Sequence, residues 1–349
     1  MVLFERRKFG LFVLPLLLFG LCACKRDFSI NSDSEAFPVV YGLLNVWEDE
    51  HYVKIFKSFV TEGNAYDVVN DIDKYSYIDS IVVYLNEYDE NTILKRKILM
   101  DTTTAIPKDS GVFLSPTQIL YVAKAVLNRD YLYEIEIINP YTKNIARTKV
   151  PIEVVGTVSI TRPSGYVLSM TDRGMDFEFS TGKNITMYQL LLKFYYTEEL
   201  SDSTNRQPAP IVWDIGSIVD PSAAAGMTKK ISISSGSIFF QKIAENIRDN
   251  DNVWLRHTDS IVLEVYSAGR DWGLYIQSNL PTTGINQDRL HYTNIIAYNT
   301  ETGEEKYAMG IFSSRGRTTR TYDDLALNGS RDSLFHGRYT GHLRFSDEY

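Results

Sequence analysis

Cysteine is almost absent from this chain of 349 residues. The two that occur, Cys22 and Cys24, stand near the start, so no residue after them carries a thiol. A disulfide framework, a zinc site built from thiolates and a cysteine nucleophile are therefore excluded from the body of the protein.

The chain also lacks the short motifs that mark common catalytic and nucleotide-binding sites. It has no Gly-x-Ser-x-Gly elbow and no dinucleotide fingerprint, and the segment 181–184 lacks the first glycine and the final hydroxyl of a phosphate-binding loop. Its 5 histidines are scattered, with no pair at metal-ligand spacing. We therefore expect no cofactor, no metal ion and no enzyme activity.

The chain has fewer basic residues than acidic ones, 36 against 44. The formal net charge is -8, and it falls to about -10 once a leader carrying three basic residues and one acid is removed. Nucleic acid is therefore excluded as an expected partner, and so is adhesion to anionic lipid by charge alone.

Long hydrophobic runs are missing except near the start. Basic residues at 6–8 precede an apolar run at 9–19, which is shorter than the ~20 residues that a membrane-spanning helix needs. The run ends in Leu21-Cys-Ala-Cys24, which resembles the lipobox of bacterial lipoproteins. We expect residues 1–23 to be a lipoprotein signal peptide and Cys24 to be lipidated; the alternatives are an ordinary cleaved signal or a short membrane anchor.

The first half of the body has the pattern of short strands. Residues 24–37 are mostly polar and predict a lipidated tether. From residue 38 onward apolar and polar residues alternate, as in Tyr131–Ile137, and turn residues separate the runs. Seven such strands without an amphipathic helix favour an immunoglobulin-like β-sandwich over residues 38–155.

Residues 156–349 are predicted to form a second β-rich domain with one or a few short helices. Pro151 and Pro163 bracket the expected join. One segment, near 237–247, changes to helical spacing, with Phe240, Ile243 and Ile247 on one stripe. The fold class expected for the whole chain is therefore mainly β.

The binding candidates are few, and each has an ordinary structural explanation. Tryptophans usually fill cores, but Trp272 is flanked by glycines, which favours an exposed loop able to stack on a ligand. The acidic pairs and triplets at 48–50, 71–73 and 323–324 match no calcium-binding pattern, and solvated loops explain them.

A basic patch is the second candidate for ligand or partner contact. Arg315, Arg317 and Arg320 lie close together in an otherwise acidic chain. The alternative interpretation is a solvated loop with no partner.

Four short segments resemble a large family of Bacteroidota lipoproteins that contain a domain of unknown function. They are Val40–Leu43, Lys57-Ser58, Asn294-Ile295 and Gly310–Ser313. The resemblance implies an N-terminal β-sandwich, a mixed second domain, and an outer-membrane lipoprotein often found beside TonB-dependent transporters. It implies no activity, because the family has none established.

These observations favour a non-enzymatic outer-membrane lipoprotein, an accessory or binding component of a TonB-dependent uptake or envelope system. Lipid on Cys24 would be its membrane contact, and the cell surface is favoured over the periplasmic face. A surface adhesin or glycan-binding lipoprotein is the alternative, because the chain is rich in aromatic residues. A hydrolase would need convergent acids in a cleft.

Overall fold

The computed structural model confirms the prediction of a mainly β protein. It describes residues 36–58, 71–108, 117–222, 224–279 and 292–346. Strands make up 49% of it and helices 13%, in four β-sheets with a few short helices. The predicted signal peptide, Cys24 and nearly all of the tether lie outside the described residues.

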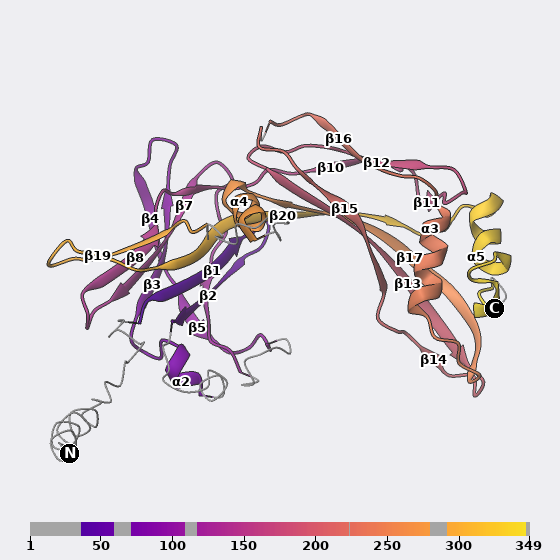
Figure 1. The fold of residues 1–349 in the computed structure, drawn as a ribbon, viewed down its shortest axis with the longest axis horizontal. Helices are drawn as coiled ribbons and strands as arrows, with labels where there is room; N and C mark the ends of the chain where they lie inside the picture. Colours follow the sequence, from indigo (N-terminus) through magenta and orange to yellow (C-terminus); the bar gives the residue numbers. More distant parts are fainter. Residues whose placement is uncertain (1–35, 59–70, 109–116, 223, 280–291, 347–349) are drawn as a thin grey trace, which may run out of the picture.

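Two sheets enclose a first hydrophobic core; Figure 1 draws their strands from the first half of the chain in indigo to magenta and β19 in orange. One is the half of a nine-stranded sheet that runs β1-β2-β6-β5, and the other runs β19-β18-β8-β7-β3-β4, with β9 beside β7. Core side chains come from alternate positions of both sheets, as the pleat requires. The strands of this first unit are β1 Pro38–Leu44, β2 Glu50–Lys57, β3 Val82–Tyr88, β4 Leu94–Leu99, β5 Asp101–Thr103, β6 Leu120–Lys124, β7 Leu132–Asn139, β8 Asn144–Thr148, β9 Ile152–Glu153, β18 Ile295–Asn299 and β19 Glu305–Lys306.

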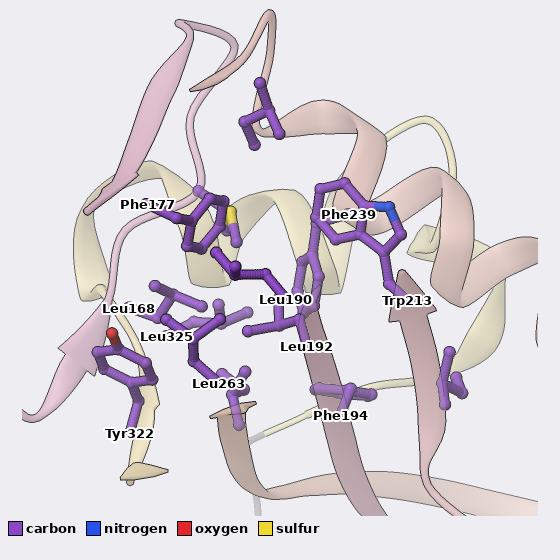
Figure 2. Packing of buried hydrophobic residues seen from close by; sticks show 14 of the residues in the cluster. Leu168, Phe177, Leu190, Leu192, Phe194, Trp213, Phe239, Leu263, Tyr322 and Leu325 are labelled. Carbon is purple, nitrogen blue, oxygen red and sulfur yellow. The ribbon is translucent and has the colours of Figure 1, made fainter. Parts of the chain in front are cut away.

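A second core lies at the other end of the molecule. The long strands β13 and β17 form its floor, a three-stranded sheet β10-β12-β16 packs over them, and helices close the side. Figure 2 shows Phe177, Phe239 and Leu263 pointing toward one another from these elements. The strands of this second unit are β10 Ser159–Arg162, β11 Val167–Leu168, β12 Met175–Ser180, β13 Met187–Leu200, β14 Asn205–Arg206, β15 Ile211–Val219, β16 Thr228–Ile233, β17 Val253–Ala268 and β21 Asp324–Leu325.

The predicted helix near 237–247 is confirmed as α3, Ser237–Asn246. Its stripe faces the second core, because Phe240 is 3% exposed and Ile243 and Ile247 are buried beside it. Ser235 accepts a hydrogen bond from the backbone N–H of Ser237 at the start of the helix. The other helices are α2 Ile72–Tyr75, α4 Arg270–Asn279 and α5 Asp332–His336, with single helical turns at Leu327–Arg331 and Gly341–Leu343.

One strand, β20 (Met309–Tyr322), belongs to both units. Its first half pairs in parallel with β1, from Val39 opposite Met309 to Leu44 opposite Ser314. Its second half pairs antiparallel with β17, from Arg315 opposite Ala268 to Tyr322 opposite Ile261. The nine-stranded sheet therefore runs without a break from one core to the other (Figure 1).

This sharing departs from the domain division expected at residue 155. Strands β18 and β19 and the first half of β20 fall in the range 156–349, yet all three belong to the first unit. Strand β18 pairs with β8, β19 pairs with β18, and β20 pairs with β1 and contributes Phe312 to the first core. Periodicity gives the type of each strand but not its partner, and these partners lie more than a hundred residues apart in the chain.

Residues from the segments that carry the family resemblance hold β20 in place. Gly310 has a φ of +118°, and a β-carbon built there would overlap the carbonyl oxygen of Val40. The Asn294 side chain donates to the Phe312 carbonyl at 2.7 Å and accepts from the Phe312 N–H at 2.9 Å. These residues therefore have structural roles: Gly310 allows the close approach of β20 to β1, and Asn294 ties β20 to the segment before β18.

Among the described residues, no helix has both the length and the apolar character needed to cross a membrane.

Replacing Gly310 with alanine should destabilise the protein by well over 1 kcal/mol, because the new methyl group adds overlap with β1 to the strain of a positive φ. Gly165→Ala is the matched control, since Gly165 has a φ of +94° but no neighbouring atom within 4 Å. Urea denaturation of both variants measures the difference. Equal losses in the two variants would show that the close approach of β1 and β20 contributes no stability.

Candidate functional site

The outer face of the first sheet carries aromatic side chains. In β1 and β2, residues such as Val40 and Val53 point into the core, so Tyr41, Tyr52 and Phe56 point to the opposite face. Tyr41 is 37% exposed. Its ring stacks with Phe56, with the ring centroids 6.1 Å apart.

Helix α4 lies against β20 beside these rings. The backbone N–H of Trp272 donates to Ser313 Oγ at 3.3 Å, and the Trp272 ring stacks on Tyr275 at 5.6 Å. Tyr275 in turn meets Tyr41 edge-on at 6.2 Å. Four rings from two strands and one helix therefore form a continuous row.

The prediction that Trp272 lies in a loop is wrong, because it lies in the first turn of α4. Its neighbour Gly273 suggested a loop from the sequence, but in the structure this glycine allows a close contact between the helix and its neighbour. A β-carbon at Gly273 would lie 2.9 Å from Thr186 Oγ1, so the missing side chain lets the helix approach β13.

A hollow of about 280 Å³ opens beside this row. We call it the aromatic groove; Tyr41, Glu48, Glu50, Tyr52, Trp272 and Arg315 are among the residues that line it. It brings together two of the residues that the sequence analysis proposed for ligand contact, Trp272 and Arg315. The two acids belong to the segment 48–50, which was expected to be only a solvated loop.

The charged groups around the groove are paired. Glu48 accepts from Asn45 Nδ2 at 2.7 Å and lies 3.7 Å from Arg315. Glu50 lies 3.0 Å from Lys124 and accepts a hydrogen bond from the Tyr52 hydroxyl. Each of the two acids is therefore paired with a base, Glu48 with Arg315 in the lining and Glu50 with Lys124 just outside it.

Hydrogen bonding and burial shift the pKa values of the groove's hydroxyl and carboxyl groups in opposite directions. The Tyr52 hydroxyl, and then Lys124, hold the pKa of Glu50 below its usual range. Burial, together with the hydrogen bond from Tyr275, raises the pKa of Tyr41 to about 12. At neutral pH the carboxylate is thus an acceptor and the tyrosine hydroxyls keep their protons.

The three arginines of the predicted basic patch do not form one surface. Arg315, Arg317 and Arg320 lie on strand β20 and not in a loop. Arg317 lies 3.6 Å from the buried carboxylate of Glu264, away from the groove's lining. Arg320 points to the other face of the strand and donates to the Pro163 carbonyl at 2.8 Å. Only Arg315 of the three lines the groove.

Two larger hollows exist, of about 940 and 890 Å³. The first lies between the two sheets beside Phe37 and Tyr307 and has a mainly apolar lining. The second lies between α4 and the segment 149–153. Its aspartate, Asp271, already accepts a hydrogen bond from the Tyr292 hydroxyl at 2.5 Å. The first hollow also has a ring pair, Phe37 with Tyr307 at 6.2 Å, and an ion pair, Lys306 with Glu304 at 3.2 Å. Neither hollow is lined by Trp272 or Arg315, the residues proposed from the sequence for ligand contact.

The groove has the chemistry of a binding surface. Aromatic faces offer apolar contact, and carboxylate, amide, hydroxyl and guanidinium groups at the rim offer directed hydrogen bonds. Over the described parts of the chain, no three histidine or acidic side chains gather in a way that would hold a metal ion.

The sequence analysis missed Tyr41 and Tyr275. Tyr41 could have been found from strand alternation, because it follows Val40, a core position, in β1. Tyr275 is three residues after Trp272, a spacing that places two side chains together only on a helix, and that helix was not predicted.

Comparison with known proteins adds no relative: no family model matches the chain, and neither does any curated protein sequence.

His51 makes stability depend on pH. It is 2% exposed, and burial lowers its pKa below 6.5, against weaker opposing effects of the Ala125 carbonyl, Glu48 and Asp49. Its Nε2 lies 2.9 Å from the Ala125 carbonyl, while Nδ1 is buried without a hydrogen-bond partner. Below pH 6.5 the unfolded chain binds a proton that the folded chain does not.

The free energy of unfolding should therefore fall as the pH drops below 6.5, by up to about 1.4 kcal/mol per pH unit from this residue. His51→Gln should remove that part of the slope. Denaturant titrations of both proteins at pH 7.5, 6.5 and 5.5 measure it. Parallel pH profiles would contradict the assignment.

Proposed function

We propose that this chain is a non-enzymatic lipoprotein of the outer membrane that serves as an accessory or binding component of a TonB-dependent uptake or envelope system. The aromatic groove is the surface with which it contacts its ligand or partner. Lipid on Cys24 attaches it to the membrane, with the body on the cell surface.

One observation carries the non-enzymatic part of this proposal: Glu50 in the groove is held as an ionised acceptor. A general acid needs a pKa raised toward the working pH, as burial or a neighbouring unpaired carboxylate would provide. The pKa of Glu50 is instead lowered, by the hydrogen bond from Tyr52 and by Lys124. Glu48 is engaged by Asn45 and Arg315. This arrangement suits recognition and not proton transfer.

For the first unit we propose the immunoglobulin-like arrangement. Its support is a single core between two sheets of short, mostly antiparallel strands. The parallel pairing of β1 with β20 adds the last long strand beside the first. The membership of the wider lipoprotein family is likewise a proposal, supported by the structural role of Asn294 and Gly310 at that pairing.

Affinity purification of the full-length protein from native membranes in mild detergent tests the proposal. We expect a TonB-dependent β-barrel transporter to co-purify, and whole-cell protease treatment to digest the body. Cys24→Ala should abolish palmitate incorporation and release the protein from the membrane fraction, because the lipid is its only proposed anchor.

Three results would argue against this account: recovery of the protein without any barrel, protection from protease in intact cells, or palmitate labelling of the Cys24→Ala variant. Each contradicts a different part of it, namely the partner, the location and the anchor.

A further inference from the structure

The aromatic groove has features that select a class of ligand. Its ring row runs from Phe56 through Tyr41 and Tyr275 to Trp272, with neighbouring centroids 5.6 to 6.2 Å apart. Trp272 and Tyr41 line the hollow itself. A ligand there meets flat apolar faces, which favour a ligand with a flat apolar face of its own.

The rim decides between the ligands that bind aromatic faces. The faces of aromatic rings attract a quaternary ammonium group or a lysine side chain, and unbalanced negative charge nearby strengthens that attraction. Here Glu48 is offset by Arg315 and Glu50 by Lys124. A cation would therefore gain little from the rim, and a purely aromatic ligand would desolvate these charged groups without replacing their hydrogen bonds to water.

A neutral saccharide fits both features. The C–H face of a sugar ring is flat and apolar, while the hydroxyls around its edge both donate and accept hydrogen bonds. The rings of Trp272 and Tyr41 can contact the apolar face of the sugar. The carboxylate of Glu50 and the guanidinium of Arg315 can hydrogen-bond to its hydroxyls.

We propose that the aromatic groove binds a neutral oligosaccharide, with a sugar ring stacked on Trp272 and its hydroxyls hydrogen-bonded to Glu50 and Arg315. This inference rests on the proposed function, because it names the ligand class of the same binding surface. The hollow, at about 280 Å³, is smaller than the ~300–1,000 Å³ of pockets that enclose a whole ligand. It therefore holds one part of a longer chain.

The test uses the full-length protein in detergent, with starch, dextran, xylan and galactomannan as probes in native affinity gels. At least one of these neutral polysaccharides should retard the protein. Trp272→Ala should weaken that retardation about tenfold or more, which corresponds to ~1.4 kcal/mol. Trp254→Ala is the matched control, because Trp254 is 62% exposed on β17 and does not line the groove.

A second variant guards against loss of the fold. Glu50→Gln keeps the size of the side chain and removes an acceptor charge, so it should weaken binding severalfold while thermal unfolding stays within a few degrees of the wild type. Circular dichroism checks the fold of all three variants.

Three outcomes would overturn the inference. The first is that none of the four polysaccharides retards the wild type. The second is that Trp272→Ala binds as well as Trp254→Ala. The third is that choline quenches the tryptophan fluorescence and the saccharides do not. If saccharides fail while the barrel transporter still co-purifies, the ligand class is wrong and the proposed function stands. If saccharides bind but no barrel transporter co-purifies, the ligand class stands and the proposed transporter partner is wrong.

Discussion

The pairing of β20 with strands of both units is the constraint on which the rest of the structure depends. A single strand of Met309–Tyr322 completes the sheet of the first core beside β1 and the sheet of the second core beside β17. Because consecutive residues of one strand cannot shift independently, the two sheets are held in one register. Gly310 and Asn294 secure the half that lies against β1.

The aromatic groove is a consequence of this pairing. Its lining comes from β1 and β2 near the start of the described chain, from α4, and from Arg315 at the midpoint of β20. Strand β17 ends at Ala268, opposite the point where β20 passes from one unit to the other, and the chain then turns into α4 against Ser313 of β20. The helix that carries Trp272 is thus placed over the first sheet by the same strand that joins the units.

Local patterns in the sequence predicted the parts of the fold that depend on local physics. Alternation over Tyr131–Ile137 predicted a strand with one apolar face, and the residues of that face, Tyr133, Ile135 and Ile137, are buried. The change to helical spacing identified α3. The glycines around Trp272 led to the wrong prediction of a loop, because glycine is most common in turns. Gly273 is instead required by the contact of α4 with Thr186.

Most of the parts that sequence could not predict depend on contacts between distant segments. Nothing in residues 309–322 alone says that one half pairs with β1 and the other with β17. The proximity of Trp272, Arg315 and the acids at 48–50 follows only from that pairing. The basic patch divided for a local reason, because its residues lie on a strand that was not predicted there, and a strand sends Arg317 and Arg320 to opposite faces.

Native-state hydrogen exchange along β20 tests most directly whether this strand makes one structure of the two cores. We expect the protected amides of residues 309–314 and of 315–322 to exchange with the same free energy of opening, equal to that of global unfolding. If residues 315–322 opened together with β17 at a lower free energy while 309–314 stayed protected, the units would be independent and the account contradicted.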